Sequence, residues 1–333
     1  MTAAAEPAQA PTRHNRGRIA AFAIRVGALF MFALIMAYFA ATAPGFVSTF
    51  NIINVIEQSA ILGVLAIGMA VVIIGGGSDV QTGGIDLSIA ANAGLCAAIY
   101  ALMTNAGYNQ IVTVSATFAA GMAIGGLNAF AVVWLGILPL LATLASMNVA
   151  AGLELTITEN TVVGTTSSLL TVLAGGRFLG VSALALVLIL FSLAAALVIH
   201  RTPAGVRLYV VGGHSEAARA AGLNTALYTA STYIFSGFCA AFASILIVSR
   251  LSASTPGTGE LLLSVLAAAL LGVVFSRRFI PTIGGTLLAV LFIGFLANGF
   301  QLLSISSYWV SGVQGVLILV VVAVTTFARP QER

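Results

Sequence analysis

Polar and apolar positions fall into long blocks along this chain. Apolar runs of about 20 residues recur almost to the C-terminus, and each is long enough to cross about 30 Å of hydrocarbon as a helix. The runs show little period-two alternation, which disfavours a transmembrane barrel, and lipid offers no partners for backbone polar groups outside helices. The pattern predicts an all-α polytopic membrane protein with about ten transmembrane helices. The predicted spans are approximately 19–41, 58–74, 87–103, 111–135, 139–155, 181–199, 227–248, 261–275, 284–302 and 308–327.

Arginines set the predicted orientation. All 13 basic residues are arginine, and they cluster before the first span, in the long central loop and at the C-terminus. Because basic residues concentrate on the cytoplasmic side of a membrane, we expect both termini and the central loop in the cytoplasm. Residues 1–18 are small, polar and basic, which predicts a disordered cytoplasmic tail. Residues 19–328 would then form a single transmembrane domain, with its cytoplasmic loop at 200–224.

The composition excludes a water-soluble domain. The chain is 60% hydrophobic and only 7% charged, whereas soluble domains have about 25% charged residues. The net charge of +4 comes from arginines at the ends of spans, so it does not indicate nucleic-acid binding. Cys96 and Cys239 both lie inside apolar runs, which favours a packing role over a disulfide or a metal site.

The central loop ends in a segment that predicts a very short helix. Ser215 is a suitable N-cap, Glu216 and Arg219 match the dipole of the helix, and Gly222 can adopt the left-handed conformation that ends it. The pair at 212–213 is expected to supply the preceding turn. A helix this short is marginal alone, so it needs support from the membrane domain or from a partner. The alternative is an ordinary basic cytoplasmic loop.

A second motif, Gly-Gly-Ile-Asp-Leu-Ser at 83–88, predicts a broken helix. Its glycines free the backbone, and Asp86 can cap the helix that restarts after them. An ionised aspartate at the centre of a membrane helix costs about 3 kcal/mol, so this residue belongs at a helix start in a wet crevice. Two interpretations stay open, a cap at the membrane edge or an added role in a solute path or gate. The glycine-rich residues 75–82 before the motif resemble an insertion.

Amides and hydroxyls inside the apolar spans are candidates for a polar path. An amide offers both donors and acceptors, which suits a hydroxyl-bearing solute, although buried amides also bond helices to one another. The candidate residues of a translocation path or gate are Asp86, Ser88, Asn92, Asn128, Asn148 and Asn298.

These two motifs resemble those of the permease subunits of bacterial ribose/xylose/arabinose-type sugar ABC importers. Residues 83–88 match the family signature G-G-I-D-L-S over six consecutive positions. The central loop resembles the family segment T-x-x-G-R-x-x-x-x-G-G-N-x-x-A-A-x-x-x-G. It departs from that segment at Arg207, which stands one position late, and at His214, which replaces the asparagine.

The resemblance implies a role in an assembly. In the family, the central segment seats in a groove of an ATPase subunit and receives its motion. The implied ATPase-coupling residues are Gly205, Arg207, Gly212, Gly213, Ser215, Glu216, Ala217, Ala218, Arg219 and Gly222. The implied partners are a second permease subunit (a homodimer or a homologous heterodimer), cytosolic ATPases that hold ATP–Mg, and a periplasmic solute-binding protein. The expected location is the bacterial inner membrane, and the expected cargo is a monosaccharide or a similar small polar solute.

The sequence offers no catalytic or metal site. With no lysine it cannot supply the phosphate-binding motif G-x-x-x-x-G-K-[ST], so ATP hydrolysis is assigned to another polypeptide and no cofactor is expected in this chain. One alternative is a self-sufficient secondary transporter, which would need intramembrane ionisable groups that the later spans almost lack. Another is an intramembrane protease using Asp79 and Asp86, but nothing in the glycine-rich segment between them enforces the required proximity.

Overall fold

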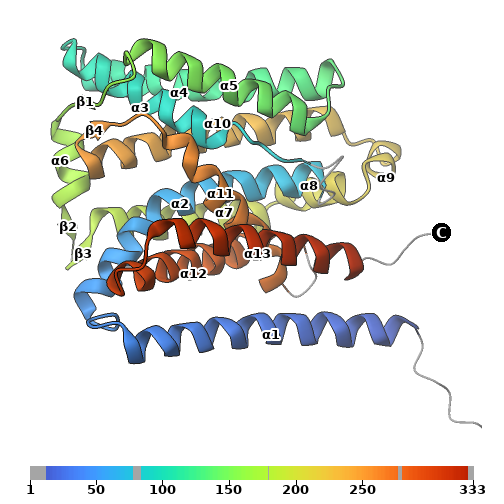
Figure 1. Ribbon diagram of the computed structural model, residues 1–333. Coiled ribbons are helices and arrows are strands. Elements are labelled where there is room, and N and C mark those ends of the chain that lie inside the picture. The colour runs from blue at the N-terminus through green and yellow to red at the C-terminus, as the bar shows by residue number, and fades with distance from the viewer. Residues whose placement is uncertain (1–12, 78–83, 179, 277–279, 329–333) are drawn as a thin grey trace, which may run out of the picture.

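The protein is a bundle of long, roughly aligned helices (Figure 1). The computed structural model describes residues 13–77, 84–178, 180–276 and 280–328. The elements are α1 (Arg13–Thr42), α2 (Thr49–Gly76), α3 (Ile89–Asn105), α4 (Gln110–Ala129), the π-helix η1 (Phe130–Trp134), α5 (Pro139–Ile157), β1 (Val163–Gly164), α6 (Ser168–Gly175), β2 (Arg177–Phe178), β3 (Val181–Ser182), α7 (Ala183–Arg201), α8 (Pro203–Gly213), α9 (Ser215–Ala220), α10 (Thr225–Leu251), β4 (Ala253–Ser254), the 3-10 helix η2 (Thr258–Leu261), α11 (Leu262–Phe275), α12 (Ile283–Leu302) and α13 (Ser307–Ala328).

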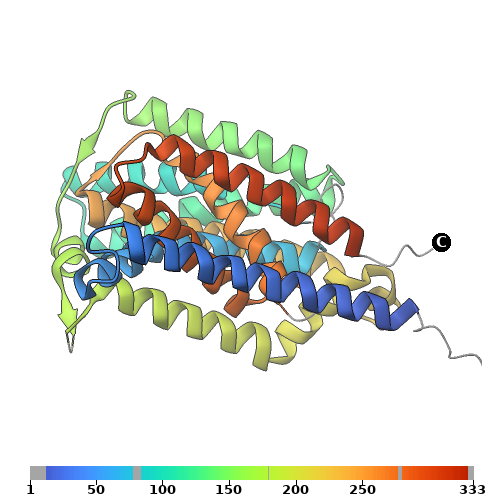
Figure 2. The same ribbon diagram turned by 60° about the horizontal axis from the view of Figure 1, so that its bottom comes forward.

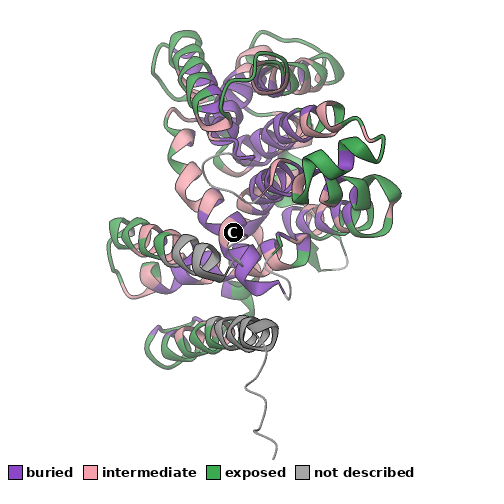
Figure 3. Ribbon diagram, turned by 90° about the vertical axis from the view of Figure 1, so that its right-hand side faces the viewer, coloured by how far each residue is buried: buried purple, intermediate pink, exposed green. Residues whose placement is uncertain are grey.

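Two helices form the centre of the bundle. α2 and α10 are the most buried of the long apolar helices. In an end-on view the buried residues face the interior of the bundle and the exposed ones its outside (Figure 3). α2 packs against α7, α10, α11 and α12, while α10 packs against α2, α3 and α4. Hydropathy alone does not explain the central place of α2, because α7 is more apolar and much less buried.

The prediction of a polytopic all-α membrane protein is confirmed. Within the described residues, seven helices are long and apolar enough to cross a membrane. Three shorter apolar helices, Leu29–Thr42, Ile89–Asn105 and Tyr308–Leu319, fall at the first, third and last predicted spans.

The first two helices begin earlier than predicted. α1 starts at Arg13, inside the segment expected to be a disordered tail; residues 1–12 lie outside the described residues. α2 starts at Thr49 rather than near residue 58, because Ser48 caps it by accepting a hydrogen bond from the amide of Asn51 at 3.2 Å. Ser48 lies between the first two predicted spans.

The segment after the fifth span contains ordered structure. α5 continues to Ile157, close to the end of the predicted span, and Glu154 is buried inside the helix. That region contains α6 and two short antiparallel pairs, β1 with β4 and β2 with β3. β1 pairs with β4, which is distant in the sequence, so no local pattern could have predicted this pairing.

The two ends of the bundle differ. The strands and α6 lie at one end, while α9 lies at the other, the end at which α1 starts and α13 stops (Figures 1 and 2). The predicted coupling helix therefore lies at the same end of the bundle as the start of α1 and the end of α13.

Candidate functional site

The coupling segment, defined here as residues 202–222, consists of two helices rather than a loop with one helix. α8 begins after Thr202, whose hydroxyl oxygen accepts a hydrogen bond from the amide of Gly205 at 3.4 Å, and Pro203 occupies its first turn. Threonine followed by proline is a helix-start signal, and the prediction of a loop overlooked it.

The two consecutive glycines do not form the predicted turn, because both belong to the last turn of α8. Gly212 lies against α2, where a Cβ atom would overlap the carbonyl oxygen of Ile74. Gly213 faces open space. Glycine thus allows α8 to run directly on the backbone of α2.

α9 is a six-residue helix, as the sequence predicted, but its cap differs. Ser215 is the first residue of the helix, and His214 holds the N-cap position without a side-chain capping bond. Glu216 and Arg219 lie in the first and last turns as expected. Gly222 adopts the predicted left-handed conformation with φ of +83°.

The exposure of α9 leaves it open to a partner. Ala218 is fully buried and anchors the helix, whereas the rest of α9 is exposed. Arg207 of α8 is exposed as well. The exposed members of the predicted coupling set are Arg207, Gly213, Ser215, Glu216, Ala217, Arg219 and Gly222.

α8 is also tied to the start of α12. The Tyr209 hydroxyl donates to the carbonyl oxygen of Pro281, just before α12, at 2.7 Å. Next to it, His200 Nε2 at the end of α7 accepts from the amide of Ile283 at 3.2 Å, so α7 is tied to the same helix start. Burial raises the pKa of Tyr209 to about 12, so its hydroxyl stays a donor at neutral pH. The coupling segment is therefore held by two membrane helices, α2 and α12.

Asp86 forms a buried hydrogen-bonded cluster with residues of α4 and α10. Asp86 Oδ1 accepts from the Ser88 amide at 2.9 Å, the Ser88 hydroxyl at 2.6 Å and Asn128 Nδ2 at 3.2 Å. Asp86 Oδ2 accepts from the Ser236 hydroxyl at 2.6 Å. Asn128 Nδ2 also donates to Ser88 Oγ at 2.8 Å. Protein groups donate all four of these hydrogen bonds, so both oxygens of the buried Asp86 side chain have partners.

Asp86 accepts from the Ser88 amide just before α3 and also from residues of α4 and α10. α3 begins only at Ile89, and the backbone before it, Gly84–Asp86, is not helical. Asp86 is 1% exposed. Irregular backbone in a membrane protein is tolerated where it is buried in protein or borders a wet cavity. Gly83 and residues 78–82 of the apparent insertion at 75–82 lie outside the described residues, while Gly75 and Gly76 belong to α2.

The candidate path amides divide into separate sites. Asn128 joins the Asp86 cluster, while Asn92 donates to the carbonyl oxygen of Gly121 at 3.0 Å. Asn298 forms a reciprocal amide pair with Asn51, at 2.8 and 3.0 Å.

Asn148 is exposed on α5, and its amide donates to the carbonyl oxygen of Leu144 at 2.8 Å. The structure brings together Asp86, Ser88 and Asn128 and leaves the other three candidates apart.

Two residues of α10 belong to this region and were missed. Ser236 completes the Asp86 cluster from a position 150 residues away in the sequence. Tyr233, one turn earlier, is 1% exposed, and its hydroxyl has no hydrogen-bond partner in the part of the chain that the structure describes. In the sequence, each stands out only as a polar residue within an apolar helix, which does not by itself indicate a site.

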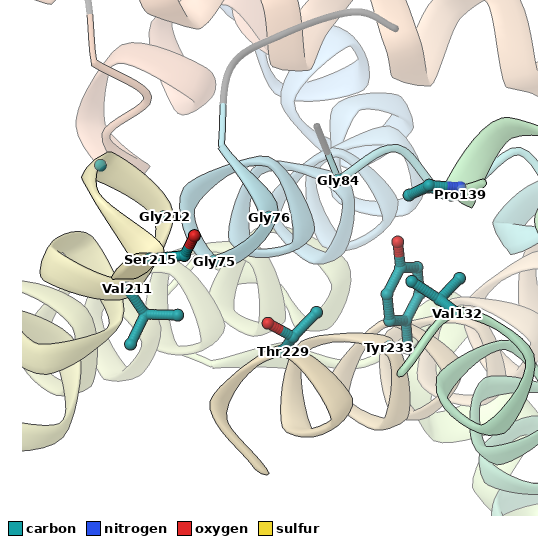
Figure 4. Close-up of a pocket in the computed structure, with 11 residues that line it drawn as sticks. Gly75, Gly76, Gly84, Val132, Pro139, Val211, Gly212, Ser215, Thr229 and Tyr233 are labelled. Atoms are coloured by element: carbon teal, nitrogen blue, oxygen red, sulfur yellow. The ribbon is translucent and has the colours of Figure 1, made fainter. Parts of the chain in front are cut away.

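A cavity of about 210 Å³ lies between the coupling segment and the broken helix (Figure 4). Its walls come from the end of α2, the junction of α8 and α9, α10 and the connection from η1 to α5. The lining residues are Gly75, Gly76, Gly84, Val132, Pro139, Val211, Gly212, Gly213, Ser215, Thr229 and Tyr233.

Comparisons with known proteins agree with this geometry. Residues 51–322 match the family described as branched-chain amino acid transport system / permease component. The chain is 33% identical to the ribose import permease protein RbsC of Bacillus subtilis over 282 residues, which cover 84% of this chain and 85% of the relative. It is 33% identical to RbsC of Escherichia coli K12 over 297 residues, or 87% and 90% of the two chains. The L-arabinose ABC transporter permease protein AraH of Azospirillum brasilense is 27% identical over 329 residues, or 98% and 95%. No solved structure gives a significant match.

Proposed function

The chain belongs to the permease-component family of branched-chain amino acid transport systems and is the multi-pass membrane subunit of an ABC importer, and on this premise we propose that it imports a monosaccharide or a similar small polar solute. Relatives named for ribose, L-arabinose and autoinducer 2 support this solute class. Three hydroxyl-bearing residues in the lining of the cavity beside α9 are consistent with it.

The proposed topology has ten transmembrane helices, with both chain termini in the cytoplasm. The seven long apolar helices and the three shorter ones support the number. The orientation is supported by the arginines around α9, since basic loops are retained on the cytoplasmic side. The strands and α6 at the opposite end would then face the periplasm (Figure 1).

The coupling function is assigned to α8 and α9. One observation carries this assignment: the exposed α9 continues from a helix whose Gly212 rests on the backbone of α2. The end of α2 leads toward the broken helix that holds Asp86. Motion of an ATPase groove around α9 would thus reach the Asp86 cluster through α8 and α2, and a packed contact of this kind transmits displacement because it compresses little.

The proposed gate is the cluster of Asp86, Ser88 and Asn128 with Ser236. Four donors converge on one carboxylate, so the cluster holds the broken helix to α4 and α10 while it is intact. Asn92 and Asn298 hydrogen-bond to neighbouring helices, and we assign them to helix packing rather than to contact with the solute. Asn148, with its exposed amide on α5, suits a surface that a second permease subunit covers.

The proposed assembly contains a second permease subunit, cytosolic ATPases and a periplasmic solute-binding protein. ATP–Mg binds to the ATPases, and this chain catalyses no reaction itself. The absence of lysine supports this division, since a phosphate-binding loop of the usual kind needs one.

Reconstitution tests the function. The chain, its ATPase and its solute-binding protein are placed in liposomes, and uptake of radiolabelled D-ribose, L-arabinose and L-leucine is measured. We expect sugar uptake that requires ATP and the binding protein. Uptake by the chain alone under an ion gradient would favour a secondary transporter, and uptake of L-leucine without sugar uptake would contradict the solute class.

A further inference from the structure

The cavity beside α9 is large enough for a small ligand and lies outside the Asp86 cluster. Its volume of about 210 Å³ is far larger than the roughly 30 Å³ that one water occupies in the liquid. It is smaller than the 300 to 1,000 Å³, approximately, that drug-sized ligands need. A molecule of monosaccharide size or smaller suits it.

The chemistry of the walls favours a neutral, hydroxyl-bearing ligand. None of the lining residues that the structure describes is charged. Three of them, Ser215, Thr229 and Tyr233, carry hydroxyls, each of which can both donate and accept a hydrogen bond. Five glycines in the lining leave backbone groups uncovered by side chains. Both oxygens of Asp86 already accept hydrogen bonds within their own cluster.

Tyr233 supplies an independent indication of a ligand. Its hydroxyl is buried and has no partner among the described residues. Figure 4 shows the side chain rising from α10 with the hydroxyl directed toward the space between Gly84 and Pro139. A buried hydroxyl without a partner typically costs about 1–3 kcal/mol, which a hydrogen bond from a ligand would recover.

The position of the cavity fits the inner end of a transport path. Tyr233 lies eight residues after the start of α10, which places it about 12 Å along that helix from the α9 end. Ser236 and the Asp86 cluster lie about one turn deeper. A solute that has passed the cluster would therefore meet this cavity next.

We propose that the cavity is an inner binding site for a neutral polyhydroxy solute of monosaccharide size, occupied after the Asp86 cluster and before release into the cytoplasm. The proposal rests on the proposed function for its solute class. Because Gly213 and Ser215 of the coupling segment form part of the wall, movement of α9 changes the site, and by linkage an occupied site biases the position of α9.

Cysteine protection tests the proposal in the complete importer. Thr229→Cys places a thiol in the cavity wall, and its rate of modification by a small water-soluble methanethiosulfonate is measured with and without D-ribose or L-arabinose. Cys96 and Cys239 are buried, so the wild-type chain gives the background rate. Leu227→Cys is the matched control, because residue 227 is exposed on α10 outside the coupling segment and does not line the cavity.

We expect a transported sugar to slow modification of Thr229→Cys by about threefold or more and to leave Leu227→Cys unchanged. Adding Tyr233→Phe, which removes only the unpaired hydroxyl, should raise the sugar concentration for half-protection by roughly three- to tenfold. An unchanged half-protection concentration would overturn the role of Tyr233 in the site.

Wild-type uptake separates failure of this site from failure of the proposed function. If the wild-type importer takes up a sugar that never protects Thr229→Cys, the cavity holds only water and the proposal is overturned while the function stands. If the importer takes up no sugar at all, the proposed solute class and the site are both overturned.

Discussion

Gly212 of α8 and Ile74 of α2 are in backbone contact, and the space between them is too small for a side chain. A Cβ atom on residue 212 would overlap the Ile74 carbonyl oxygen. Gly77, just after α2, lies beside the same segment, since a Cβ there would come within 3.0 Å of the Gly212 carbonyl oxygen. The coupling segment therefore meets the membrane core at a rigid contact between two main chains.

The first prediction concerns this contact. Gly212→Ala should force α8 away from α2, because overpacking of a tight contact costs about 1–3 kcal/mol. We expect ATP-driven uptake by the reconstituted importer to fall by about tenfold or more, while ATP hydrolysis continues. Uptake and hydrolysis are measured in the same liposomes so that coupling is separated from expression.

Gly126→Ala in α4 is the matched control, because a Cβ on this helical glycine meets open space and the residue lies outside the coupling segment and the cavity wall. It should leave uptake within about twofold of wild type, since alanine favours a helix more than glycine does. Equal losses from the two substitutions would show that glycine content, rather than the contact with Ile74, matters for coupling.

The second prediction concerns the hydrogen bond from Ser236 to Asp86. Ser236→Ala removes one donor from a buried carboxylate, and hydrogen bonds to charged groups are worth about 1.5–3 kcal/mol. Thermal unfolding of the purified chain in nanodiscs should shift to lower temperature. Ser231→Ala, on the exposed side of α10 where the hydroxyl bonds only to the Tyr228 carbonyl, should change it little. Similar shifts for the two serines would refute a special role for the cluster.

The third prediction separates packing from transport at Asn298. Its amide exchanges two hydrogen bonds with Asn51, joining α12 to the start of α2. A double-mutant cycle with alanine at both positions should give a coupling energy of about 0.5–2 kcal/mol in stability, as found for hydrogen bonds between membrane helices. A loss of uptake by Asn298→Ala without loss of stability would instead make this residue part of the path.

Local patterns predicted the elements whose causes are local. The glycine at 222 takes the left-handed conformation that was expected of it, and Glu216 and Arg219 occupy opposite ends of α9. The break before α3 follows directly from the glycines of the motif and the short polar side chains of Asp86 and Ser88. The length of the apolar runs was sufficient to find the membrane-spanning helices, because lipid leaves backbone polar groups no partners outside helices and closed barrels.

Features that depend on distant partners were not predictable in this way. Ser236 reaches Asp86 only because α10 packs beside the broken helix. Asn298 was a candidate for the path, and its pairing with Asn51 across 247 positions could not be derived from either neighbourhood. The extension of α8 through Gly212 is explained by the contact with α2, whereas propensity alone favours a turn at two glycines.

The most direct test of the account is cross-linking of α9. Glu216→Cys introduces an exposed thiol on this helix, and Phe178→Cys introduces one on β2 at the opposite end of the bundle. Intact cells carrying each variant are treated with a membrane-impermeant maleimide, and the purified complex is treated with a short bifunctional cross-linker. The account predicts that Glu216→Cys resists external labelling and cross-links to the ATPase subunit, while Phe178→Cys is labelled and does not cross-link. External labelling of Glu216→Cys, or its failure to reach the ATPase, would contradict the assignment of α9 as the coupling helix.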